Sequence, residues 1–287
     1  DQHVGSVGAH RPIPPADLDD PEARLFVRKS MYGEGSEIPR DEWRFARGEN
    51  GDPDPEHVWL QGGFVPGRIY DVVYRPARCP VVGAGMLAVR DLGVFLRNDV
   101  RAPTSNRVDV AIAEGISQCG RFLRTFLHYG MNQTERGERV FDGMLIHVAG
   151  GRRGEVNHRY AQPSVQPTPS FGHRFPFADH GQIDPTSGVS AGLLDLLESG
   201  KCSPRVFYTD TSSEYWRGDA GLAHADPATG EDLALPENVR RYLFSSTQHG
   251  PGSLPITGAS PFGNRGANAF NVVDYRPLYR AALENLR

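Results

Sequence analysis

The stretch Ala-Glu-Gly-Ile-Ser-Gln-Cys-Gly-Arg, residues 113–121, lies where a strand pattern passes into a helix pattern. Residues 108–113 are short, β-branched and apolar, which is typical of a buried strand. Residues 118–129 carry apolar side chains at helical spacing. A serine on such a turn, with small residues two positions before and two positions after it, has the pattern of a nucleophile elbow. Ser117 is therefore the candidate nucleophile of this chain.

Length and composition are those of an ordinary globular protein. A chain of 287 residues is most simply one large α/β domain spanning 1–287, and its 33 glycines and 23 prolines predict many turns and long loops. A net charge of −4 gives no electrostatic reason to expect a nucleic-acid partner. No apolar run reaches the roughly 18 residues that a membrane span needs, so we expect none.

The cysteines and the first residue bear on whether the chain has a metal or disulfide site and whether it is a processed form. Cys79, Cys119 and Cys202 are odd in number and lack a C-x-x-C spacing, which argues against a zinc site and against a disulfide framework, although one disulfide is possible. The sequence opens at Asp1 without a leader, so we expect a mature form or a fragment. Compartment and oligomeric state are left open.

Apolar patterns along the chain alternate between strand and helix. We expect strands over 69–74, 108–113, 141–148, 206–209 and 241–245, helices over 85–96, 118–129, 190–199 and 278–286, and short edge strands over 25–27 and 43–45. This alternation favours a mostly parallel sheet flanked by helices.

Two segments without periodicity complete the chain. Residues 1–24 are polar and proline-rich and are expected to form an extended arm. Residues 151–190 are rich in proline, glycine, arginine and aromatic residues, and a segment of that length within a domain is usually a lid or a binding loop. Its substrate-facing side chains are expected among Arg152, Arg153, His158, Arg159, Phe171, Phe175 and Phe177. Alternatively, the arginines of this segment pair with carboxylates and hold the loop in place.

Candidate partners for Ser117 follow two later strands. A serine needs a base to accept its proton and an acid to orient that base. Asp210 and Glu214 come after the strand over 206–209, and Asp219 is close by. His249 follows the strand over 241–245 in a Gly/Pro turn. The order serine, acid, histidine is that of the α/β-hydrolase arrangement.

Attack of Ser117 on an ester carbonyl would place negative charge on the carbonyl oxygen, which two backbone N–H groups are expected to stabilise. The N–H of Gln118 lies at the positive end of the predicted helix and is the first expected donor. The second is expected in the loop after the strand over 69–74, near Arg75.

Four motifs together carry a resemblance. Residues 115–124, 147–155, 213–219 and 247–250 resemble a family of bacterial α/β-hydrolase-domain proteins, from about Leu25 to the C-terminus. The resemblance implies an α/β-hydrolase fold, with Ser117 as nucleophile, His249 as general base and Glu214 as acid. Members tend to be longer at the N-terminus, which implies that strands completing the sheet precede this chain. Cys119 stands where glycine is usual in the elbow.

The resemblance implies cleavage of carboxylic esters without naming a substrate. Such a reaction needs no metal and no organic cofactor, because the acyl-enzyme route carries it. Besides Arg152 and Arg153, we assign Trp216 to substrate binding, and we expect His147 to be a hydrogen-bonded core residue. Asp210 and Asp219 remain alternatives to Glu214. Alternative functions are thioester or amide cleavage and a non-catalytic hydrolase-like binding protein.

Overall fold

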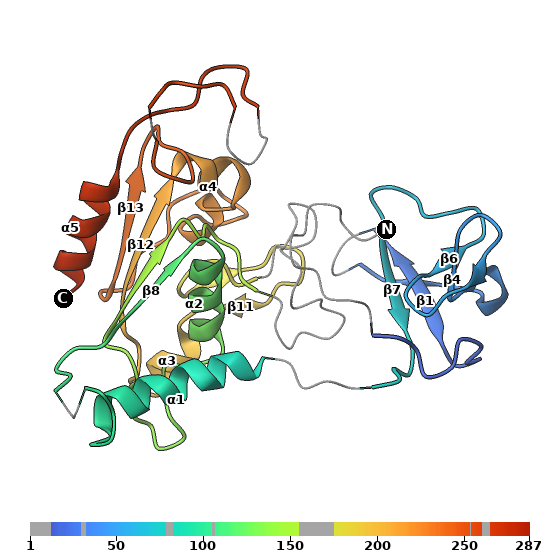
Figure 1. The fold of residues 1–287 in the computed structure, drawn as a ribbon, viewed down its shortest axis with the longest axis horizontal. Helices are drawn as coiled ribbons and strands as arrows, with labels where there is room; N and C mark the ends of the chain where they lie inside the picture. The colour runs from blue at the N-terminus through green and yellow to red at the C-terminus, as the bar shows by residue number, and fades with distance from the viewer. Residues whose placement is uncertain are drawn as a thin grey trace. The chain divides into compact units, whose positions relative to one another are not determined.

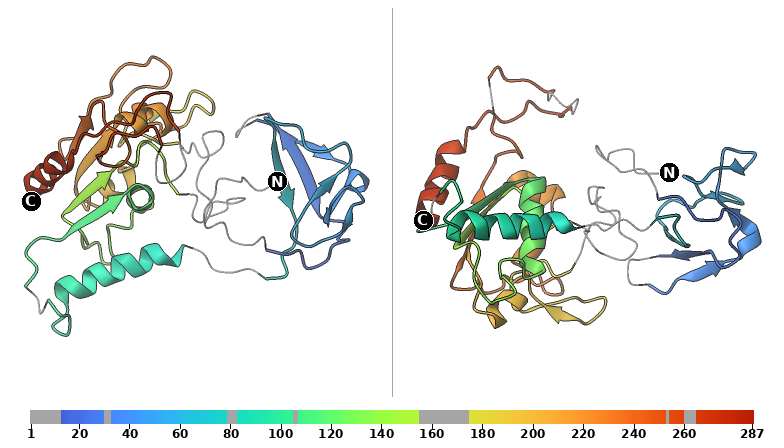
Figure 2. Two further views of the ribbon diagram at one scale, coloured as in Figure 1. Left: turned by 45° about the horizontal axis from the view of Figure 1, so that its top comes forward. Right: turned by 60° about the horizontal axis from the view of Figure 1, so that its bottom comes forward.

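A computed structural model describes residues 13–29, 33–78, 83–104, 107–154, 175–252, 254–259 and 265–287 (Figures 1 and 2). These residues form two compact units, one before Gly83 and one from Gly83 onward. Each unit is described by itself below. The assignment of 1–287 to a single domain stays a prediction.

The first unit is built from short antiparallel strands. Its main sheet has the order β2 (Ser36–Ile38), β1 (Arg24–Arg28), β7 (Ile69–Val73). The segment predicted as an edge strand over 25–27 is therefore the central strand of its sheet, with Leu25 buried beside Trp43 and Phe45. A turn of 3-10 helix (Arg40–Glu42) and two small strand pairs complete the unit: β3 (Trp43–Arg44) with β6 (Trp59–Leu60), and β4 (Ala46–Arg47) with β5 (Asp52–Pro53).

The described part of the predicted arm is residues 13–24, and residues 13–16 pack along the end of β7. Backbone hydrogen bonds join Ala16 N to Arg75 O and Ala77 N to Pro14 O, both at 2.8 Å. The Tyr74 hydroxyl donates to Ile13 O at 2.6 Å. This part of the arm is thus held by residues 74–77.

The second unit contains a four-stranded parallel sheet. Its order is β13 (Val239–Phe244), β12 (Arg205–Thr211), β9 (Gly143–His147), β8 (Ile112–Ile116), and all three pairings are parallel. The parallel α/β architecture expected from the alternating pattern is confirmed for these four strands.

Helices pack on opposite faces of this sheet (Figure 1). α2 (Gln118–His128) lies on the face that carries Gly115 and Tyr208. α5 (Arg276–Leu286) lies on the other face, where Ala282 and Leu286 pack against Leu145 and Phe207. α1 (Ala84–Asn98) packs by Gly93 against Val140 and Phe141. The shorter elements of the unit are β10 (Gln182–Ile183), β11 (Ser190–Ala191), α3 (Asp195–Ser199), α4 (Ser212–Arg217) and a turn of 3-10 helix (Gly221–Ala223).

Two expected elements begin elsewhere than predicted. The strand expected over 108–113 is β8, which runs from Ile112 to Ile116. It begins later than predicted because the backbone N–H of Ala111 donates to the Asp142 carboxylate instead of to a neighbouring strand. The helix expected over 190–199 is reduced to α3, because residues 190–191 pair with β10.

The expected lid is not seen in the described part of 151–190. In residues 175–190, Phe177, Ala178 and Asp179 are buried, and the Gln182 side chain accepts hydrogen bonds from the N–H groups of Phe177 and Ala178. These residues pack into the second unit because their backbone groups find partners there. Residues 155–174, including His158, Arg159 and Phe171, lie outside the described residues.

Candidate active site

Ser117 occupies a strained turn between β8 and α2. Its backbone has φ 56° and ψ −112°, which is unusual for a residue with a side chain. The Ser117 N–H donates to His147 O at 2.8 Å, so the turn is held against the end of β9. This is the sharp strand-to-helix turn that an elbow requires.

Glycines allow the elbow to close. A Cβ at Gly115 would lie 2.5 Å from Cys119 O and 2.9 Å from Leu123 Cδ1. A Cβ at Gly120 would lie 3.0 Å from His147 O, where α2 approaches β9. Cys119 itself is exposed, which explains why a residue larger than glycine fits there.

His249 lies beyond the end of β13 and reaches Ser117. Its Nε2 is 2.9 Å from Ser117 Oγ, across 132 positions of sequence. Its Nδ1 is 2.6 Å from Glu214 Oε1. Because a carboxylate only accepts hydrogen bonds, Nδ1 carries the proton and Nε2 is left to accept from the serine hydroxyl. This is the tautomer a general base needs.

Glu214 is held by its own helix terminus. It is the third residue of α4, and its Oε2 accepts hydrogen bonds from Thr211 N at 2.8 Å and Thr211 Oγ1 at 2.5 Å, in a capping box. Burial alone would raise the pKa of Glu214, but the hydrogen bonds from His249 and Thr211 outweigh it and hold this pKa below its usual value. The carboxylate is thus ionised where it faces the imidazole.

Asp210 and Asp219 have other partners. The buried Asp210 accepts a hydrogen bond from Gly150 N at 3.0 Å, and burial raises the pKa of its carboxyl. Asp219 forms an ion pair with Arg152 at 2.9 Å. Among the three candidate acids, Glu214 is the one that the structure brings to His249.

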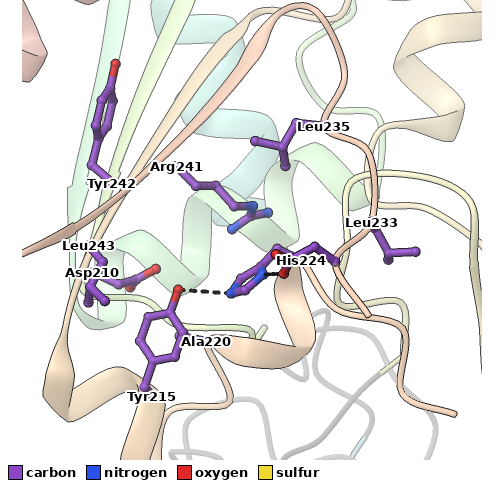
Figure 3. A pocket seen from close by; sticks show the side chains of 10 residues that line it. Asp210, Tyr215, Ala220, His224, Leu233, Leu235, Arg241, Tyr242 and Leu243 are labelled. Carbon is purple, nitrogen blue, oxygen red and sulfur yellow. Dashed lines mark hydrogen bonds and ion pairs between the residues drawn. The ribbon is translucent and has the colours of Figure 1, made fainter. Parts of the chain in front are cut away.

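Asp210 also lines a cavity of about 280 Å³ (Figure 3). In this cavity the Tyr215 hydroxyl lies 3.0 Å from His224 Nε2, and His224 Nδ1 lies 2.9 Å from Asp232. The Arg241 side chain extends into the same space. Ser117 and His249 are not among the described residues that line it.

Backbone strain concentrates at the carboxyl edge of the parallel sheet. Ser117, Val148 and Ser246 have positive φ values of 56°, 46° and 59° and follow β8, β9 and β13. Strain of this kind is found where a functional site constrains the backbone. At Val148, a β-branched residue, the conformation is a marked outlier.

The two expected oxyanion donors lie in different units. Gln118 is the first residue of α2, so its N–H has no acceptor within the helix. Arg75 belongs to the first unit, and the strand before it, β7, pairs antiparallel with β1. The role of Arg75 stays a prediction.

The three expected substrate-binding residues differ in exposure. The Arg152 side chain is paired with Asp219 and donates to Arg217 O, and the buried Arg153 donates to Phe175 O at 2.7 Å. Trp216, on α4, is 89% exposed. These contacts favour the alternative in which the arginines tie the loop in place, and a role in substrate binding stays a prediction for all three.

The roles of Thr211 and Ser213, which support the site, were not predicted from the sequence. Thr211 fixes Glu214, and Ser213 Oγ accepts a hydrogen bond from the His249 N–H at 3.2 Å. The spacing Thr211-x-x-Glu214 is a capping-box pattern and could have identified the first. No local pattern indicates the second, because its partner is 36 residues away.

The described residues contain neither a metal-binding cluster nor a membrane-spanning helix. No group of three or more histidine, cysteine or acidic side chains there is arranged to hold a metal ion. No helix in the same ranges is long and apolar enough to cross a membrane.

Among the comparisons with known proteins, a family model gives a match. No curated protein and no solved structure gives a significant match. The family model described as alpha/beta hydrolase domain matches residues 61–287, which contain the elbow, Glu214 and His249. The chain therefore belongs to the alpha/beta hydrolase domain family.

Proposed function

We propose that this protein is a serine hydrolase that cleaves carboxylic esters through an acyl-enzyme intermediate. The observation that carries the proposal is the chain of two hydrogen bonds, Ser117 Oγ to His249 Nε2 at 2.9 Å and His249 Nδ1 to Glu214 at 2.6 Å. Family membership suggests hydrolase activity in general. The ester class and the roles of the three residues are the proposal.

In the first half-reaction, Ser117 Oγ attacks the ester carbonyl while His249 Nε2 accepts the serine proton. The buried, ionised Glu214 stabilises the imidazolium that forms. His249 then protonates the alcohol as the carbon–oxygen bond breaks, leaving the acyl group on Ser117. The N–H of Gln118, at the positive end of α2, is proposed to stabilise the oxyanion.

In the second half-reaction, water takes the place of the alcohol. His249 accepts a proton from the water as its oxygen attacks the acyl carbonyl, and it returns the proton to Ser117 as the acid leaves. Both steps use only side chains, backbone N–H groups and water.

Trp216 is the most exposed of the proposed substrate-binding residues and offers an aromatic surface on the helix that carries Glu214. Replacing it by alanine is expected to raise KM for esters with large apolar acyl groups more than for acetate esters. The variants Arg152→Lys and Arg153→Lys test in the same way, through KM, whether the two arginines bind substrate.

The proposal is tested by a panel of p-nitrophenyl esters and a fluorophosphonate probe. The wild type should hydrolyse at least one ester and bind one equivalent of probe at Ser117, and Ser117→Ala should lose both properties. Hydrolysis at the wild-type rate by Ser117→Ala would contradict the mechanism. A wild type that neither turns over nor reacts with the probe would indicate a binding protein, and preference for thioesters or amides would indicate the alternative acyl transfer.

A further inference from the structure

The backbone of His249 is held on both sides by side chains. Its N–H donates to Ser213 Oγ at 3.2 Å, and its carbonyl accepts a hydrogen bond from the Tyr275 hydroxyl at 2.9 Å. Ser213 is on α4, next to Glu214, whereas Tyr275 precedes α5. The backbone on both sides of the His249 Cα is therefore anchored, on one side to α4 and on the other to the residue before α5.

Tyr275 is itself firmly placed. It is buried, and its ring lies 5.4 Å from the Phe244 ring and 5.3 Å from the His147 ring. α5, which follows it, is anchored by Leu286 in the core. Burial raises the pKa of Tyr275 to about 12, so its hydroxyl keeps its proton at neutral pH.

His147 is a second polar neighbour of the Tyr275 hydroxyl. Its Nε2 is 3.3 Å from that hydroxyl, and its Nδ1 is 2.8 Å from Thr209 Oγ1 and 3.1 Å from the Thr209 carbonyl oxygen. Burial lowers the pKa of His147 to about 4, so this imidazole is neutral and carries one proton.

The Tyr275 hydroxyl has a single hydrogen, and a carbonyl oxygen can only accept hydrogen bonds. The bond of 2.9 Å to the His249 carbonyl therefore uses that hydrogen, with Tyr275 as the donor.

We propose that Tyr275 is a positioning residue for His249, and that its hydroxyl, which donates to the His249 carbonyl, helps to hold the imidazole between Ser117 and Glu214. The inference rests on the proposed function, in which His249 is the general base. The imidazole of His249 is half exposed, with 49% of its side chain accessible, so its backbone anchors contribute directly to keeping it between Ser117 and Glu214. Enzymes lose rate when such a group moves even slightly from its productive geometry.

The test compares Tyr275→Phe with Tyr279→Phe. Phe at 275 keeps the ring contacts and loses the hydroxyl. Tyr279 is a matched control, because it lies four residues later, in α5, and its ring lies 4.5 Å from the same His147 ring. Its hydroxyl bonds to Glu114 at 2.5 Å instead of to His249. We expect Tyr275→Phe to lower kcat about tenfold with KM within twofold, and Tyr279→Phe to keep the wild-type kcat.

A second readout does not depend on turnover. The proton between His249 Nδ1 and Glu214 should give a far-downfield NMR resonance in the wild type and in Tyr279→Phe, and it should shift or broaden in Tyr275→Phe at an unchanged melting temperature.

Wild-type kcat together with an unshifted resonance in Tyr275→Phe would overturn the inference. If the wild type itself has no hydrolase activity, the proposed function fails separately, and the resonance decides whether Tyr275 positions His249.

Discussion

Thr211 and Glu214 are joined by two hydrogen bonds, from the Thr211 N–H at 2.8 Å and the Thr211 hydroxyl at 2.5 Å, both to the carboxylate oxygen that does not face His249. The candidate acid is thereby positioned within a single turn of helix. Only the meeting of His249 with Ser117 and Glu214 then depends on contacts distant in sequence.

Removing the Thr211 hydroxyl should change the pH dependence of the reaction. Thr211→Val keeps the shape and the backbone N–H but removes one donor to Glu214, so the pKa of Glu214 should rise and the acid limb of the kcat/KM profile should move to higher pH. The loss of the cap should also lower stability by about 1 kcal/mol. Rate profiles between pH 4 and 8 and urea unfolding measure the two effects.

Thr211→Ser is the control for this prediction, because it keeps the donor and removes only a methyl group. Its acid limb should coincide with that of the wild type. An equal displacement in the serine and valine variants would show that the hydroxyl does not influence Glu214.

The two carboxylates of this segment should differ sharply in their effect on rate. Glu214→Gln loses the charge that stabilises the His249 imidazolium and should lower kcat by roughly a thousandfold. Asp210→Asn keeps an acceptor for Gly150 N and should leave kcat within about threefold of the wild type. Steady-state kinetics on the best ester of the panel decides, and the opposite ranking would move the acid to Asp210.

Gly115 should tolerate no side chain. In Gly115→Ala the new Cβ would meet the Cys119 carbonyl oxygen at 2.5 Å, so the elbow must shift. Overpacking of this kind costs about 1–3 kcal/mol, and a displaced Ser117 should lower kcat as well. Gly85→Ala in α1 is the control, since nothing lies within 4 Å of its Cβ and alanine favours a helix. Urea unfolding should show a loss for the first variant and none for the second.

The candidate site could be predicted from sequence because its parts are local to strand ends. Ser117, Glu214 and His249 each follow a strand with a clear apolar pattern, and parallel strands bring their carboxyl ends to one edge. The strand pattern alone therefore placed them close together, and the resemblance assigned their roles.

The parts that could not be predicted depend on distant pairing. The pattern of residues 69–73 indicates a strand but not its partner, and β7 pairs with β1 in an antiparallel sheet instead of joining β8. Tyr275 stands in a segment without periodicity, and its contact with His249 exists only because α5 packs against the sheet. Asp179, buried in the predicted lid, is paired with Arg241 at 2.6 Å, a contact that no local pattern indicates.

Asp210 and Glu214 should make opposite contributions to stability as pH changes. The folded pKa of Asp210 is raised by burial, so between its unfolded value of 3.8 and its folded value the native state binds more protons than the unfolded state. Stability contributed by this residue therefore falls as pH rises through that window. Asp210→Asn removes this loss of stability at higher pH. The free energy of unfolding of the variant, relative to that of the wild type, should therefore increase with pH and then level off.

Glu214 gives the reverse slope. Its folded pKa is below the unfolded value of 4.5, so its ionised form adds stability above that value, and the contribution is lost as pH falls through the folded pKa. Glu214→Gln should therefore lose stability relative to the wild type as pH rises from about 3 to 6. Urea unfolding of the wild type and both variants at a series of pH values measures the two differences. Slopes of the same sign would mean that the hydrogen bonds from His249 and Thr211 do not outweigh the burial of Glu214.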